Sequence, residues 1–185
     1  MKEVCYFDYN STSPLREGAR NEMLLYLEKD FYNPASGYRG AREIKIKINR
    51  LRRDILDYLN SKRGIIIFTS GGSEANNLAI KGIFKANRNQ GNHVITSSIE
   101  HKSVLETCKA IEKEGAEVTY LPVDSKGIIS VQELEKSIKP NTVLITIMGI
   151  NNENGIKQPL SQIGAIAKKI TSIFILIMYK VFAKK

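Results

Sequence analysis

The chain repeats one pattern from Ile65 onward: a short apolar run, a polar loop and then a stretch with helical periodicity. The apolar runs are continuous rather than alternating, which is typical of strands that have both faces covered. Parallel strands need long crossover connections, and the crossover is usually a helix. The pattern therefore predicts an α/β fold whose mainly parallel sheet is flanked by helices.

Turn residues and apolar spacing give the expected boundaries of these elements. Upstream of the repeat, Ile44, Ile48, Leu51, Ile55 and Leu59 recur at three-to-four spacing and predict a long amphipathic helix. The expected strands are Ile65–Thr69, His93–Ser97, Glu117–Val123 and Val143–Met148, and the other expected helices are Glu17–Glu28, Glu74–Asn87, Lys102–Lys113 and Val131–Ile138.

The chain has 185 residues, about one domain's length, and a formal charge of +9. Its densest basic region, 39–63, lies on the predicted amphipathic helix, so we interpret it as a solvated face and expect no nucleic-acid binding. Cys5 and Cys108 lack metal-ligand spacing, which predicts neither a metal site nor a disulfide and favours a reducing, cytoplasmic location. Ile170–Ala183 is apolar but short and contains Lys180, so it predicts a buried strand and no membrane span.

Three polar clusters follow predicted strands: Ser70–Glu74, Ser97–Ser103 and Asn151–Gly155. Each has an ordinary explanation when taken alone, namely a tight turn with Ser73 as a helix cap, a surface histidine at His101 and an asparagine-rich turn. In an open α/β sheet, however, ligands bind beyond the carboxyl ends of the strands. The first cluster also places two glycines and a hydroxyl at a helix N-terminus, which is a phosphate-binding arrangement.

Taken in order, these segments resemble the cysteine desulfurase branch of the class V, fold-type I aminotransferases, which use pyridoxal phosphate. Tyr6–Pro14 (YFDYNSTSP) is similar to the family's N-terminal signature, and Thr69–Ile80 (TSGGSEANNLAI) is similar to its phosphate loop. Glu100–Leu105 (EHKSVL) and Asn151–Gly155 (NNENG) match its next two motifs. The resemblance covers Tyr6–Lys169, nearly the whole chain.

The resemblance implies a role for four residues. Gly72 and Ser73 would bind the phosphate of pyridoxal phosphate, His101 would stack on the pyridine ring and move protons, and Asn152 would bond the phenolic oxygen. An intact member of the family would transfer sulfur from L-cysteine, giving L-alanine, to a protein cysteine persulfide. Its implied partners are a second copy in a homodimer and the acceptor or scaffold proteins of iron–sulfur cluster assembly or RNA thiolation.

Two small departures from the family pattern lie within the matched segments. The family usually has Ala-Thr where this chain has Gly72 and Ser73, a change that keeps the hydrogen-bond donors. The loop Asn33–Ala41 is one residue shorter than the family's and has Tyr38 where a histidine is common.

The larger departure follows Lys169, where the family has a His-x-Asp-x-x-Gln strand and, later, a Schiff-base lysine and a catalytic cysteine. No residue of this chain matches these motifs. With suitably chosen synonymous codons, putting back one base lost just before Ile175 would restore the strand motif, with its Asp at the place of Ile177 and its Gln at Lys180. We therefore expect an entry segment (1–15), a partial cofactor-binding large domain (16–169) and an out-of-frame tail (170–185).

The missing groups lead to a functional hypothesis. Catalysis by pyridoxal phosphate needs the covalent lysine linkage and, for desulfuration, a thiolate nucleophile. We therefore expect a truncated cysteine desulfurase that is inactive by itself. The alternative is a non-catalytic fragment that pairs with a full-length relative.

Overall fold

A computed structural model describes residues 5–9, 11–170 and 173–178 of the chain. The chain divides into two compact units, Met1–Phe68 and Thr69–Lys185.

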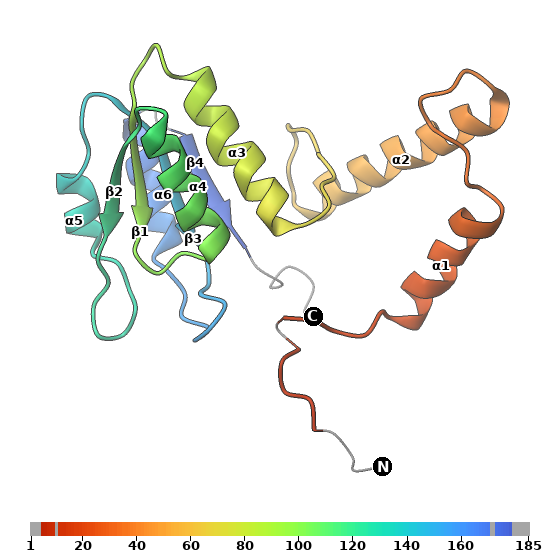
Figure 1. Cartoon of the computed structure of the whole chain (residues 1–185), viewed down its shortest axis with the longest axis horizontal. Coiled ribbons are helices and arrows are strands. Elements are labelled where there is room, and N and C mark those ends of the chain that lie inside the picture. Colours follow the sequence, from red (N-terminus) through yellow and green to blue (C-terminus); the bar gives the residue numbers. More distant parts are fainter. Residues whose placement is uncertain (1–4, 10, 171–172, 179–185) are drawn as a thin grey trace. The chain divides into compact units, whose positions relative to one another are not determined.

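The first unit contains two helices, α1 (Glu17–Glu28) and α2 (Arg39–Tyr58) (Figure 1). Both helices were predicted from the sequence, α1 with the same bounds. Helix α2 buries Ala41 and Ile44, whereas α1 has no buried residue.

The predicted strand at Ile65–Thr69 is wrong, because these residues form no regular secondary structure. The carbonyl oxygen of Ile66 accepts a hydrogen bond from Arg52 Nε at 3.2 Å, and the Arg52 guanidinium lies 5.3 Å from the ring centre of Phe68. Apolar β-branched residues favour a strand, but a strand also needs a neighbour to pair with. No described strand pairs with this segment.

The second unit is a four-stranded, all-parallel sheet with the order β2-β1-β3-β4. The α/β prediction is therefore confirmed. The strands are β1 (His93–Ser97), β2 (Glu117–Leu121), β3 (Thr142–Met148) and β4 (Ile173–Ile177), and the helices are α3 (Gly72–Ala86), α4 (Lys102–Lys113), α5 (Val131–Lys136) and α6 (Leu160–Lys169).

The predicted boundaries are matched at β1 and α4 and differ by a few residues at β2, β3, α3 and α5. Helix α6 was not predicted. Strand β4 lies in the apolar stretch for which a buried strand was expected, although residues 171–172 and 179–183 of that stretch, including Lys180, lie outside the described residues.

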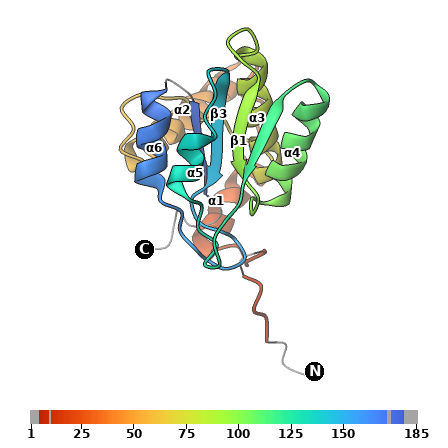
Figure 2. The same cartoon turned by 90° about the vertical axis from the view of Figure 1, so that its left-hand side faces the viewer.

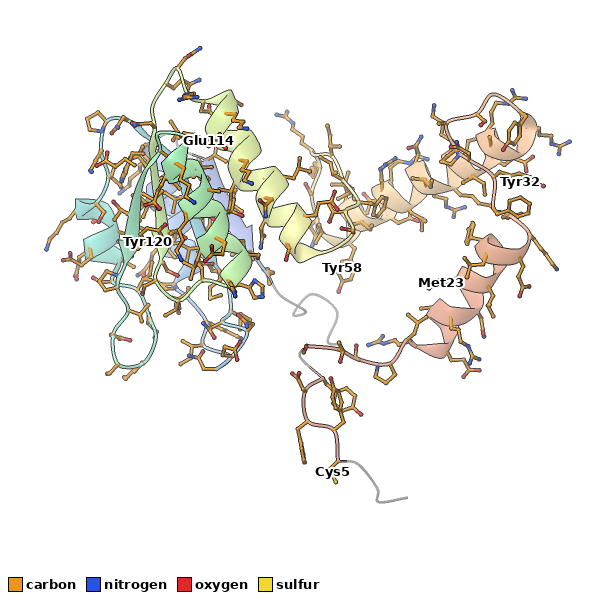
Figure 3. The ribbon with its side chains drawn as sticks, in the orientation of Figure 1. Cys5, Met23, Tyr32, Tyr58, Glu114 and Tyr120 are labelled. Carbon is orange, nitrogen blue, oxygen red and sulfur yellow. The ribbon has the colours of Figure 1, made fainter. Side chains whose placement is uncertain are left out.

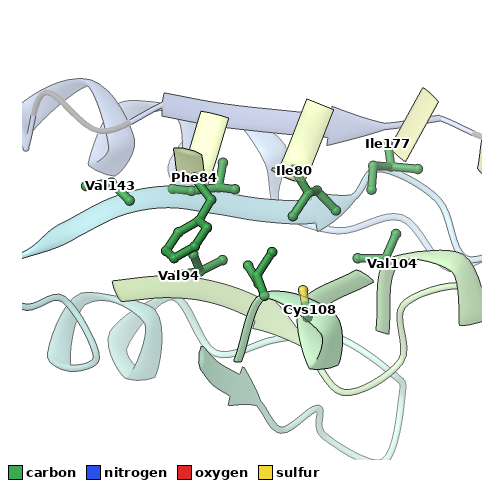
Figure 4. Close-up of a cluster of buried hydrophobic side chains, with 9 residues drawn as sticks. Ile80, Phe84, Val94, Val104, Cys108, Val143 and Ile177 are labelled. Atoms are coloured by element: carbon green, nitrogen blue, oxygen red, sulfur yellow. The ribbon is translucent and has the colours of Figure 1, made fainter. Parts of the chain in front are cut away.

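Helices cover both faces of the sheet (Figure 2). On one face, Ile80 and Phe84 of α3 pack with Val104, Cys108 and Ile111 of α4 in a cluster completed by sheet residues (Figure 4). On the other face, α5 and α6 contribute Leu134, Ile163, Ile166 and Ala167. This two-faced burial explains the nearly continuous apolar run of β3, which is buried at every position.

The connections change direction between β1 and β3. From β1 the chain passes through α4 to β2 on one side, and from β2 it passes through α5 to β3 on the other side of β1. The loops after β1 and β3 therefore lead to opposite faces, and such a switch point opens a crevice at the carboxyl edge of the sheet. We call this edge the β1/β3 fork. Pairing between β1 and β3 ends at Thr96 and Thr146.

Candidate functional site

The glycine-rich loop leads into the first turn of α3. The helix begins at Gly72 with Gly71 at its N-cap, so Ser73 lies in the first turn and is not the helix cap. First-turn N–H groups have no acceptor within their helix. The Ser73 side chain is exposed. Gly72 and Ser73 therefore present donors at the positive end of the helix dipole.

Glu74 binds the residue that precedes these glycines. Its Oε2 accepts hydrogen bonds from Ser70 N at 2.7 Å and from Ser70 Oγ at 2.6 Å. These bonds lower the pKa of the Glu74 carboxyl. Ser70 is therefore bonded to a carboxylate of the protein itself. The donors that remain available to a ligand are those of Gly72 and Ser73.

His101 is the N-cap of α4, and its ring is half-buried rather than exposed. Its Nδ1 accepts a hydrogen bond from Ser103 N at 3.1 Å. Because a backbone N–H can only donate, Nδ1 carries no proton, and the proton of the neutral ring is on Nε2. Ser103 Oγ lies 2.8 Å from the same Nδ1.

A hydrogen-bonded path joins His101 to the start of α3. Asn76, one turn after Gly72, donates from Nδ2 to Ser103 Oγ at 2.8 Å, and this hydroxyl is the one that contacts His101 Nδ1. Asn76 is buried, with 8% of its surface exposed. The path brings the N-termini of α3 and α4 to one edge, although no described strand precedes the glycine-rich loop.

The asparagine cluster is a turn held together by Asn151. Its buried side chain accepts from Glu153 N at 2.8 Å and from Asn154 N at 3.1 Å. Its Nδ2 donates to the carbonyl oxygen of Ile99 at 3.2 Å. Asn152 is half-buried and donates from Nδ2 to Glu153 Oε1 at 2.7 Å. Asn152 therefore follows a residue that is bonded to the loop carrying His101.

The sequence interpretation gave no role to Glu100. This residue is 5% exposed, and its Oε1 accepts hydrogen bonds from Met148 N at 2.8 Å and Ser97 Oγ at 2.7 Å. Burial raises the pKa of Glu100 to about 7, although both hydrogen bonds act in the opposite direction. The only feature of the sequence that could have pointed to Glu100 is its place directly before His101, the residue predicted to stack on the cofactor ring.

The two cysteines lie in contrasting environments. Cys5 is exposed, whereas Cys108 is fully buried in the α3/α4 cluster. Burial raises the pKa of the Cys108 thiol to about 12, so at neutral pH it is not the thiolate that nucleophilic attack requires.

The described part of the chain offers neither a candidate metal site nor a candidate membrane-spanning helix. No three His, Cys, Asp or Glu side chains there are grouped so that they could hold a metal ion. None of the helices within 5–9, 11–170 and 173–178 is long and apolar enough to cross a membrane.

Comparisons with known proteins agree with the motif order. The family model for aminotransferase class-V matches residues 5–177. The cysteine desulfurase IscS of Methanosarcina thermophila is 48% identical over 167 residues, which are 90% of this chain and 41% of that protein. The IscS of Dictyoglomus turgidum is 42% identical over 174 residues, or 94% of this chain and 44% of that protein.

Two solved structures share the fold over most of this chain. SspA in complex with cysteine has a TM-score of 0.88 and 41% identity, with 94% of this chain and 50% of that chain covered. A NifS-like protein has a TM-score of 0.86 and 31% identity, with 90% and 46% covered. The chain thus spans less than half the length of these curated relatives.

Proposed function

Because the chain belongs to the aminotransferase class-V family, we propose that it carries the phosphate-binding and ring-facing part of a cysteine desulfurase site for pyridoxal phosphate. The observation that supports this most directly is the path from Asn76 through Ser103 to His101, which ties the start of α3 to the start of α4. Asn151 ties the loop of Asn152 to the same edge.

The donor set fits the chemistry of this cofactor. A phosphate monoester suits a helix N-terminus with a neighbouring hydroxyl, which Gly72 and Ser73 provide. An imidazole can stack on a planar ring, and His101 would do so with its proton on Nε2. Asn152 would present its amide to the phenolic oxygen. When bound, the cofactor supplies an electron sink for the α-carbon of an amino acid.

The proposed substrate of the whole enzyme is L-cysteine, and its products are L-alanine and a protein persulfide for iron–sulfur cluster assembly. The relatives named above as cysteine desulfurases support this assignment. So does the structural neighbour SspA, which was solved in complex with cysteine. By the same resemblance, we assign the whole enzyme to cytoplasmic homodimers that pass sulfur to acceptor or scaffold proteins.

We further propose that the 185-residue chain alone does not turn over cysteine. None of its lysines matches the Schiff-base motif, and Cys108 is buried with a raised pKa. Where a restored reading frame would place the Asp that binds the pyridine nitrogen, this chain has Ile177, buried against Ile80 and Val104 in the α3/α4 cluster. Sequencing the gene tests the frameshift: the absence of a downstream frame that encodes a lysine-bearing half would refute it.

Incubating the purified chain with pyridoxal phosphate and L-cysteine tests the inactivity. Sulfide and alanine are measured against cofactor alone and against a full-length desulfurase. We expect the chain to match the cofactor-only blank. Sulfide release above that blank would refute the proposed inactivity.

Pairing with a full-length relative is a second candidate, favoured by the apolar surface of α1. Met23, Leu24, Leu25 and Leu27 of this helix are all exposed, and Met23 is labelled in Figure 3. Co-expression with a tagged full-length desulfurase would test it. Stoichiometric co-purification that Leu27→Glu abolishes supports pairing, and its absence with the wild-type chain argues against it.

A further inference from the structure

The backbone N–H of Met148, the last residue of β3, lies beyond the last paired residues of β1 and β3. Gly149 N donates to the carbonyl oxygen of Ile177 in β4 at 2.8 Å. Successive residues of a strand point their N–H groups to opposite sides, so Met148 N points toward β1. Pairing between β1 and β3, however, ends at Thr96 and Thr146, two residues before Met148. A buried N–H without an acceptor is costly.

Glu100 supplies the acceptor that β1 does not. Its Oε1 accepts from Met148 N, at the last residue of β3, and from Ser97 Oγ, at the last residue of β1. One carboxyl oxygen therefore joins the ends of two strands beyond the point where their own pairing has stopped. Because Glu100 is 5% exposed, water does not compete well for these bonds.

A second contact across the fork runs in parallel with the first. Asn151 Nδ2 donates to the carbonyl oxygen of Ile99. Two consecutive residues of the loop after β1 are thus bonded to residues at the end of β3 and in the loop that follows it. His101 comes directly after these two anchored residues, and Asn152 comes directly after Asn151.

We propose that Glu100 is a positioning residue, which through its Oε1 sets the placement of the His101 loop relative to the Asn152 loop at the β1/β3 fork. We call the hydrogen bonds that Glu100 Oε1 accepts from Met148 and Ser97 the brace. The brace does not depend on what the two loops bind. Only the consequence for a ligand rests on the proposed function. Glu100 touches neither the phosphate-binding turn nor the ring-facing side chains in the contacts described, so it acts through Met148 and Ser97.

Three variants separate this role from general stability. Glu100→Gln keeps a carbonyl oxygen that can accept both hydrogen bonds, whereas Glu100→Ala removes the acceptor. The matched control is Thr142→Val at the opposite end of the sheet, where Thr142 Oγ1 contacts His93 Nδ1 at 2.7 Å and accepts from Lys139 N at 2.8 Å. The control removes buried hydrogen bonds without touching the fork.

The first arm needs no ligand and follows amide hydrogen exchange in 97–101 and 148–155, relative to the rest of the sheet. We expect Glu100→Ala to speed exchange there by about tenfold, the effect of one lost hydrogen bond, while Glu100→Gln and Thr142→Val leave the ratio near wild type. The ¹⁵N shifts of the His101 ring should change in Glu100→Ala only. Equal exchange ratios in Glu100→Ala and Thr142→Val would overturn the proposal.

The second arm measures binding of pyridoxamine 5′-phosphate, which has no aldehyde and so forms no imine with surface lysines. Glu100→Ala should weaken binding by about tenfold relative to wild type. Glu100→Gln and Thr142→Val should both bind about as tightly as wild type. Equal affinity in Glu100→Ala and Glu100→Gln would overturn the link between the brace and the ligand. Failure of the wild-type chain to bind would count against the proposed function, and the exchange arm would still decide the role of Glu100.

Discussion

Replacing Glu100 by Gln should change how the stability of the fold depends on pH. The Glu100 carboxyl is buried, and its pKa is raised from 4.5 to about 7. The folded chain therefore binds this proton more tightly than the unfolded chain. Its stabilising contribution is fully present below about pH 4.5, is lost as pH rises through about 7, and does not change further above that pH.

The size of the effect follows from the shift. About 2.5 pKa units at 1.36 kcal/mol each correspond to about 3 kcal/mol, a large part of the stability of a small domain. Glu100→Gln keeps the acceptor for Met148 and Ser97 but has no proton to lose. Relative to wild type, this variant should gain about 3 kcal/mol between about pH 4.5 and about pH 8.

Urea unfolding followed by circular dichroism at a series of pH values measures this difference. Glu74→Gln is a matched control at an exposed carboxyl, where the hydrogen bonds from Ser70 lower the pKa. Its difference from wild type should change only below about pH 4.5, and in the opposite direction. A wild-type minus Glu100→Gln difference that stays constant from about pH 5 to about pH 8 would refute the reasoning, because Glu100 would then titrate as if it were solvated.

Three further substitutions test the fold. Phe84→Ala should lower the unfolding free energy by about 3–5 kcal/mol, because Phe84 is fully buried between α3 and the sheet, and a loss under about 1 kcal/mol would contradict that packing. Gly91→Ala should cost about 1–3 kcal/mol in urea unfolding, since a Cβ there overlaps the carbonyl oxygen of Asn141; unchanged stability would argue against that close approach. Burial and then the charge of Lys139 lower the pKa of His93 below 6.5, so the contribution of His93 to stability should fall as pH drops below about 6.5, and the wild-type minus His93→Gln difference should fall with it; a difference that does not change with pH would contradict it.

Elements with strong local signals were predicted well. Helix α4 starts at a capping residue, His101, and its apolar residues recur on one face. It is followed by Gly115, whose φ of +96° favours glycine. Helix α6 also had its signals, since Pro159 precedes it and Ile163, Ile166 and Ala167 share a face, but the sequence interpretation overlooked them.

The errors and omissions arise from contacts between distant residues. Ile65–Thr69 has strand-like composition, but only a neighbouring strand could make it a strand, and the local sequence does not reveal such a partner. Glu100 lies in the loop after β1 and acquires its role from Met148, which lies far along the chain at the end of β3. The motif residues Gly72, His101 and Asn152 were predicted from their order, whereas the path through Asn76 and Ser103 needed the packing of α3 against α4.

The central claim is that the starts of α3 and α4 form the phosphate-binding and ring-facing part of a pyridoxal phosphate site. Its most direct test compares binding of pyridoxamine 5′-phosphate and of pyridoxamine, which lacks the phosphate, to the wild-type chain and to Ser73→Ala. The account predicts that the phosphate ester binds more tightly and that Ser73→Ala removes much of this preference, by about tenfold for a lost hydrogen bond to a charged group. Equal binding of the two ligands, or a preference unaffected by Ser73→Ala, would contradict it.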